Sequence, residues 1–186
     1  MTARFDPSSS VAFDLGRGQI ALRGAGERVL VPADALVALL AGASTDAVRD
    51  FARRLGTEAG RRAVERLGSA GEASIEAVVE HLGGDLALMG LGALELEIWG
   101  RALVLCVSGS PLGSAGDEVL AFVLEGAMQR GFGRDAGVVR LGRDDQRARF
   151  LVTSRAGADR VRGWLDAGTP WGEVLTRLSG GARGEA

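Results

Sequence analysis

The sequence contains no lysine, no tyrosine and no asparagine, and it has a single cysteine and a single histidine. All 22 basic residues are therefore arginine. Without lysine, the chain cannot form a Schiff base through a side chain or use a lysine as general base. One cysteine, Cys106, excludes an intramolecular disulfide and a cysteine-rich zinc site. These absences remove several classes of covalent and metal chemistry.

Long apolar runs and a large net charge are also missing. No stretch approaches the roughly 18 apolar residues of a membrane-spanning helix. The opening residues MTARFDPSSSVAFDLG lack the apolar core of a signal peptide, so we expect a cytoplasmic protein without a membrane span. A net charge of −2 gives no reason to expect nucleic acid as a partner, because that needs a clustered basic surface.

The 186 residues suffice for one domain with a substantial core. We expect residues 1–10 to form a flexible arm. Glycine-containing turns then separate three short predicted strands, Val11–Leu15, Gln19–Arg23 and Glu27–Val31. Pro32 can begin a short helix that reaches about Leu40, because the first helical position needs no N–H donor. The N-terminal part is therefore predicted to be a small hairpin region followed by a helix.

Two longer helices are predicted next, over Thr45–Leu67 and from Ile75 to about Met89. The first has an apolar face and a charged face at helical spacing. Its charged face comprises Arg53, Arg54, Glu58, Arg61, Arg62 and Glu65. Such an arginine cluster could bind anions, but interspersed arginine and glutamate more often form a solvated face. Gly90 is suited to end the second helix in a left-handed conformation.

The middle of the chain predicts a strand pair followed by a buried helix. In Ala93–Trp99 the residues Leu94, Leu96 and Ile98 alternate with Glu95 and Glu97, which predicts one buried face and a place near a sheet edge. Arg101–Ser108 is apolar on both faces and should be central. Ser114 to Asp117 has the spacing of a capping box. The helix that follows is apolar on two sides, which indicates deep burial or an interface.

The C-terminal part predicts a second hairpin, Ala136–Leu141 with Arg147–Ser154, and two short helices, Ala156–Ala167 and Pro170–Leu178. Residues 179–186 are expected to be disordered. The fold class is thus α/β of the α+β kind, with an antiparallel sheet packed against helices and an N-terminal β-hairpin region.

Candidate catalytic groups are few, and each has a simpler explanation. His81 is the only histidine, on a predicted helix, and could hold a haem iron or act with Cys106 as a nucleophile pair. Cys106 lies within an apolar strand, where a thiol is inert. Glu95 and Glu97 share one side of a strand and could act as acid and base, but an exposed sheet face explains them more simply. The glycine pairs lack the pattern of a phosphate-binding loop. We therefore predict no catalytic site, no metal site and no cofactor.

Several segments resemble the 4-vinyl reductase domain superfamily, which includes Bet-type subunits of the TRAPP vesicle-tethering complex and aromatic-effector sensor domains of bacterial transcription activators. The resemblance rests on the N-terminal hairpin with Val31-Pro32, the helix end Met89-Gly90-Leu91-Gly92, the strands LELEIW and ALVLCVSGSPLG, the helix FVLEGAMQRGFG and the closing RARFLVTS. It implies a single domain over residues 11–178 that binds a ligand or serves as a scaffold, and that dimerises through helices. It also implies an apolar ligand pocket, for which the candidate residues are Trp99, Phe122, Met128, Phe132 and Phe150. Core packing explains most of the aromatic side chains equally well.

One departure from that family concerns metal. Sensor members carry zinc-binding cysteines around the final hairpin, whereas here it is VVRLGRDDQRARFLVTS, without cysteine. We therefore do not expect the zinc site of those members here. We also do not expect vinyl reduction, because no redox cofactor motif is visible. We expect a non-enzymatic homodimeric module that binds a small apolar molecule in signalling or regulation. The alternative is a protein-interaction scaffold of the TRAPP-subunit type, linked to a small GTPase pathway.

Overall fold

The computed structural model describes residues 10–68, 74–132 and 136–181. Within these residues the chain is a mixed α/β structure with two antiparallel sheets and six α-helices, which confirms the predicted fold class. The strands are β1 Val11–Asp14, β2 Gln19–Leu22, β3 Gly26–Arg28, β4 Ala93–Trp99, β5 Ala102–Ser108, β6 Ala136–Asp144 and β7 Arg147–Ser154. The helices are α1 Ala33–Gly42, α2 Thr45–Leu67, α3 Ile75–Leu88, α4 Asp117–Phe132, α5 Arg155–Asp166 and α6 Trp171–Gly181, with a 3₁₀ turn η1 over Gly113–Gly116.

The four strands β4, β5, β7 and β6, in that spatial order, form the sheet that we call the main sheet. β5 is central, as its two apolar faces predict, and β4 is an edge strand. Leu105 of β5 is paired with Leu96 on one side and with Phe150 of β7 on the other. Both Leu105 and Phe150 are fully buried, so the middle of this sheet supplies one side of the hydrophobic core.

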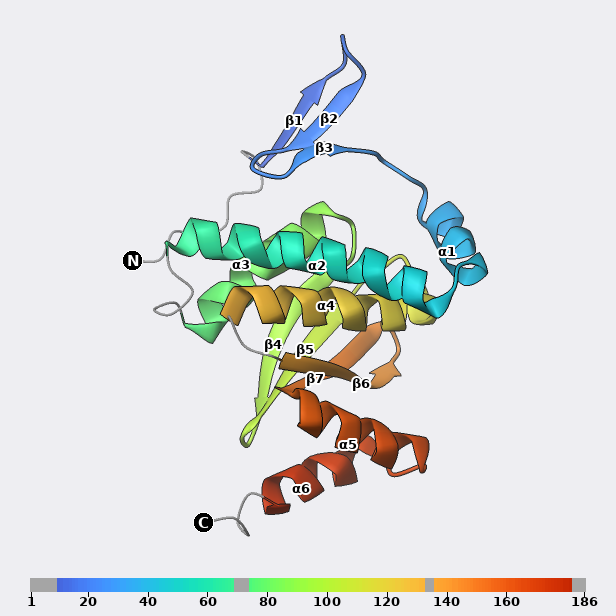
Figure 1. Cartoon of the computed structure of the whole chain (residues 1–186), viewed down its shortest axis with the longest axis vertical. Coiled ribbons are helices and arrows are strands. Elements are labelled where there is room, and N and C mark those ends of the chain that lie inside the picture. The colour runs from blue at the N-terminus through green and yellow to red at the C-terminus, as the bar shows by residue number, and fades with distance from the viewer. Residues whose placement is uncertain (1–9, 69–73, 133–135, 182–186) are drawn as a thin grey trace.

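One face of the main sheet is covered by helices in two tiers (Figure 1). α4 packs between this sheet and α2, and α3 lies over β4. The contact between α2 and α4 is close because glycines face the other backbone. A Cβ atom at Gly60 would lie 2.5 Å from the Ala127 carbonyl oxygen, and one at Gly126 would lie 2.6 Å from that of Arg53. Leu120 and Leu124 of α4 are fully buried, so its two apolar sides are explained by deep burial.

The opposite face of the main sheet is covered by α5 and α6 at the C-terminal end (Figure 1). Val161 of α5 and Val174 of α6 are fully buried against Val104 and Leu151 of the sheet. Trp171, the first residue of α6, lies beside Trp99 with ring centroids 5.0 Å apart. These contacts form a second, smaller core on the far side of the sheet from α4.

The N-terminal region is attached much more loosely. We use this name for the N-terminal sheet, β1–β2–β3, together with α1, and the name main body for the main sheet with α2 to α6. Figure 1 shows the N-terminal sheet projecting from the main body and an extended segment leading from β3 to α1. Arg28 is ion-paired with Glu58 of α2, and the Arg61 guanidinium donates to the Gly24 carbonyl oxygen at 2.7 Å. No residue of α1 is buried.

Two local expectations are wrong. Ile98 was expected to be buried with Leu94 and Leu96, yet 58% of it is exposed, because it lies near the end of an edge strand. The capping box at Ser114 is replaced by the η1 turn. The buried Asp117 carboxylate accepts hydrogen bonds from the Arg143 guanidinium, with Nε 3.1 Å away, and this pairing raises the pKa of Arg143.

At the chain ends, residues 1–9 of the expected arm and residues 182–186 of the expected tail lie outside the described residues. Ser10, the last residue of that arm, is buried, and its carbonyl oxygen accepts from the Arg23 N–H at 3.0 Å. Helix α6 extends to Gly181, three residues beyond the expected end of the domain at residue 178.

Candidate functional site

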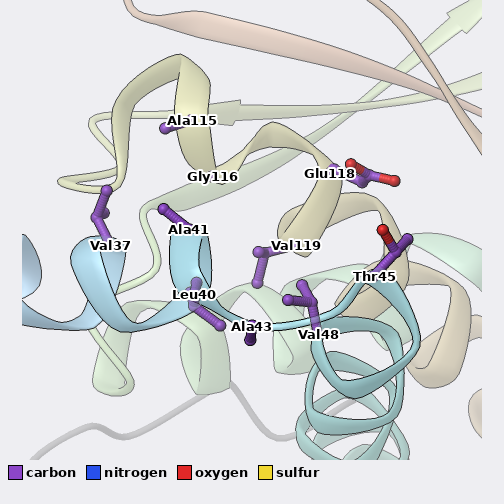
Figure 2. A pocket seen from close by; sticks show the side chains of 10 residues that line it. All are labelled: Val37, Leu40, Ala41, Ala43, Thr45, Val48, Ala115, Gly116, Glu118 and Val119. Atoms are coloured by element: carbon purple, nitrogen blue, oxygen red, sulfur yellow. The ribbon is translucent and has the colours of Figure 1, made fainter.

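One hollow in the described residues lies where α1, the start of α2 and the start of α4 meet (Figure 2). This α1–α2–α4 cavity has a volume of about 230 Å³. Most of the side chains that line it are aliphatic, although polar atoms also make up a large part of its surface; the lining residues are Val37, Leu40, Ala41, Ala43, Thr45, Val48, Ala115, Gly116, Glu118 and Val119. An engineered apolar cavity of about 150 Å³ is large enough to bind benzene. The α1–α2–α4 cavity can therefore accommodate a small ring or a short aliphatic chain.

The cavity has one polar edge. Figure 2 shows the side chains of Glu118 and Thr45 on the same side, whereas Val37 and Ala41 stand at the other end. Glu118 and Thr45 are both exposed to solvent. Such a site suits a molecule with an apolar body and a single polar group, because apolar walls with few polar groups are typical of small-ligand sites.

The local sequence explains how this hollow forms. α1 ends at Gly42, and Ala43 and Ser44 take extended conformations before α2 begins. The Ser44 hydroxyl accepts a hydrogen bond from the Ala47 N–H at 3.3 Å and so caps α2. This short connection leaves α1 next to the start of α2 (Figure 1), and Gly116 lets the start of α4 approach Leu112 closely. The wall supplied by α1 is held only by half-buried side chains, Leu36, Val37 and Leu40.

The aromatic and methionine residues predicted to bind a ligand do not line this cavity. Met128 and Phe150 are buried in the core between α4 and the main sheet. Trp99 lies on the other face of the sheet. Phe122 is half-buried on the outer side of α4, with the Arg49 guanidinium carbon 5.2 Å from its ring centroid. The side chain of Phe132 lies outside the described residues. The four described side chains do not converge, and their role in binding stays a prediction.

The charged face of α2 is predicted to be solvated, but the structure buries part of it. Arg62 is only 3% exposed, and its Nε lies 3.1 Å from the carboxylate of Asp85, which is also buried. Arg66 contacts the other oxygen of Asp85 at 3.0 Å. Arg62 is buried because α3 packs against α2 at this position and supplies the opposite charge. The arginine–aspartate pair therefore holds the two helices together.

A second hollow, of about 420 Å³, lies between α2, α4, α5 and β6. Its arginines already have acidic neighbours. Arg53 is ion-paired with the buried Glu125, and Arg162 is paired with Asp159 at 2.9 Å. Arg53, the member of the predicted arginine cluster that lines this hollow, is thus neutralised, which weakens the case for an anion site here.

The candidate catalytic groups are separated or paired. Cys106 is buried on the α5–α6 side of the main sheet, whereas α3, which carries His81, lies on the other side. Burial, followed by the charge of Glu97 and a hydrogen bond to it, raises the pKa of the Cys106 thiol to about 11. Glu95 and Glu97 are both ion-paired with Arg147. Among the described residues, no group of His, Cys, Asp and Glu side chains could hold a metal ion, and no helix is long and apolar enough to cross a membrane.

Comparison with known proteins gives a similarity in fold and none in sequence family. No family model matches the sequence, and no curated protein matches it. The fold is similar to the crystal structure of the phenol-responsive sensory domain of the transcription activator PoxR with phenol, with a TM-score of 0.56 and 16% sequence identity. The match covers 78% of this chain and 85% of that chain. At this identity the similarity concerns the fold.

Proposed function

We propose that this protein is a regulatory module that binds a small, mainly apolar molecule in the α1–α2–α4 cavity. The observation that carries the proposal is this aliphatic hollow of about 230 Å³, in a fold similar to that of a phenol-responsive sensory domain. The loosely attached α1 forms one wall, so occupancy can alter how α1 and the N-terminal sheet are held. As part of the same proposal, we retain membership of the 4-vinyl reductase domain superfamily.

The proposal is tested by thermal unfolding with small aromatic probes such as phenol. A ligand that binds only the folded state at 100 times its Kd stabilises it by about 2.7 kcal/mol. For a domain of this size, that raises the Tm by roughly 5–10 °C. The variant Ala41→Trp, which places a large side chain at the cavity wall, should abolish the shift.

The matched control is Ala35→Trp, an exposed residue of the same helix that does not line the cavity. It should keep the shift of the unsubstituted protein. If no probe of the panel raises the Tm, or if both tryptophan variants respond alike, the α1–α2–α4 cavity is not the ligand site.

A protein-interaction role is the second candidate, and a specific observation favours it. Large apolar side chains are exposed on the N-terminal region, namely Phe13, Leu15, Val29, Leu30, Val31 and Leu39. Of these, Val29, Leu30 and Val31 are consecutive, and a contiguous exposed apolar stretch marks a partner surface. We infer that this surface meets a second copy of the chain in a homodimer, or a partner protein in a scaffold of the TRAPP-subunit type.

Light scattering at low protein concentration separates these two partners. A homodimer gives twice the monomer mass, and the double variant Val29→Asp, Leu30→Asp should reduce it to the monomer mass. A monomer in both cases contradicts the homodimer and leaves the partner protein, which a pull-down with the same double variant as negative control would identify.

A further inference from the structure

The lining of the α1–α2–α4 cavity contains a single charged side chain, Glu118. Resting on the proposed function, we infer that the molecule bound there carries a protonated amine at one end of its apolar body. Glu118 of α4 and Thr45 of α2 stand together at the polar edge of the cavity, as Figure 2 shows, and would receive that group.

The Glu118 carboxylate is available for such a contact. Within the described residues it makes no ion pair or hydrogen bond, unlike Asp117 beside it, which is paired with Arg143 at 2.5 Å. Glu118 also borders the neighbouring hollow, whose cations are Arg49, Arg53, Arg155 and Arg162. All four have other partners. Arg49 lies 2.8 Å from Asp46, Arg53 is paired with Glu125, Arg162 is paired with Asp159, and Arg155 has an interaction of its own.

The N-termini of two nearby helices favour an anionic ligand, but their effect is weaker than that of the Glu118 carboxylate. α2 begins at Thr45 and α4 begins at Asp117, and the N-terminus of a helix carries about half a positive charge. Each of these ends already has acidic residues in its first turn, Asp46 in α2 and Asp117 with Glu118 in α4. A full negative charge on Glu118, without a neutralising partner, therefore determines the sign of the preferred ligand.

The position of Glu118 at the exposed edge also makes an amine acceptable energetically. A buried ammonium group would lose its hydration at high cost. At the edge, the ammonium can remain in contact with water while the apolar part of the molecule enters between Val37, Val48 and Val119. An ion pair that remains solvated contributes modestly, so we expect a preference of roughly fivefold over an uncharged analogue.

Three probes of similar shape test this inference on the full chain: benzylamine, which is cationic at pH 7, benzyl alcohol, which is neutral, and benzoate. Calorimetric titration at low salt should give benzylamine a Kd roughly fivefold below that of benzyl alcohol, with benzoate weakest. Glu118→Gln should remove the preference for benzylamine and leave the Kd for benzyl alcohol unchanged. Added salt should reduce the preference in the unsubstituted protein, because exposed charges are screened.

The control is Glu80→Gln, which makes the same charge change at an exposed residue of α3 that does not line the cavity. It should retain the amine preference. If benzyl alcohol or benzoate binds as tightly as benzylamine, or if Glu118→Gln keeps the preference, the inference is overturned while the cavity remains a ligand site. If none of the three probes binds and Ala41→Trp changes nothing, the proposed function fails with it.

Discussion

Helix α4 and helix α1 both line the cavity, but they are held in different ways. In α4, Leu120 and Leu124 are fully buried between α2 and the main sheet. In α1 no residue is buried, and 70% of Leu39 is exposed. The cavity thus has one wall fixed by the core and one wall that can move at small cost, because segments with few buried apolar contacts open most easily. This contrast supports the proposed regulatory role.

In the main body, the largest loss of stability should follow the removal of the buried ion pair between α2 and α3. Asp85→Ala leaves Arg62, which is 3% exposed, without its buried counter-ion. Among the described residues, Arg62 then keeps only the partly exposed Glu58, 3.1 Å away, so the loss in free energy of unfolding should approach the roughly 3–5 kcal/mol typical of a broken buried pair. Urea denaturation measures the change.

Asp159→Ala is the control for that experiment, because the 68%-exposed Asp159 pairs with Arg162 on the surface. It should cost less than about 1 kcal/mol. Equal losses for the two variants would mean that Arg62 and Asp85 do not hold α2 and α3 together.

The same leucine substitution in the two helices compares the walls directly. Leu120→Ala in α4 should lower the free energy of unfolding by about 2–5 kcal/mol, because it opens a void in the core. Leu39→Ala in α1 should change it by less than about 0.5 kcal/mol, since the side chain is mostly in water. A loss above about 2 kcal/mol for Leu39→Ala would show that α1 is covered, as in a dimer, and not loosely held.

Alkaline pH probes the core on the other face of the sheet through Cys106. Its pKa is raised from 9.0 to about 11, so above pH 9 the unfolded thiol loses its proton while the folded one keeps it. The stabilisation is complete below pH 9 and should be lost as the pH rises to about 11, by about 2–3 kcal/mol in all.

Few other side chains of this sequence titrate between pH 9 and pH 11. Lysine and tyrosine, which titrate near this range, are absent, and arginine remains protonated. Cys106→Ala should therefore make the free energy of unfolding nearly independent of pH between 9 and 11. An unchanged slope in that variant would show that another group is responsible.

Much of the main body follows from local patterns. α2 spans Thr45–Leu67 as predicted, because Ser44 caps its start and Gly68 ends it in a left-handed conformation with φ 82°. The central place of β5 follows from its two apolar faces, and the hairpin of β6 and β7 turns at Asp145, where φ is 42°. These features depend on residues close together in the sequence.

The features that the sequence did not predict depend on residues far apart in the chain. Nothing near Arg62 shows that Asp85, 23 residues later, will bury it, and nothing near Ser114 shows that Arg143 will take the Asp117 carboxylate. The cavity brings together Val37, Val48 and Val119 from three helices. Residue type and the family resemblance pointed to aromatic side chains and Met128, whereas the side chains that line the cavity are mostly aliphatic.

The proposed ligand site lies between the loosely held α1 and the fixed α4. Hydrogen exchange of the backbone amides, with and without a bound probe such as benzylamine, tests it most directly. We predict that the amides of α1, Ala33–Gly42, exchange rapidly in the free protein and become protected on binding, while those of β5 are protected throughout. Protection that appears elsewhere and leaves α1 unchanged would contradict the account.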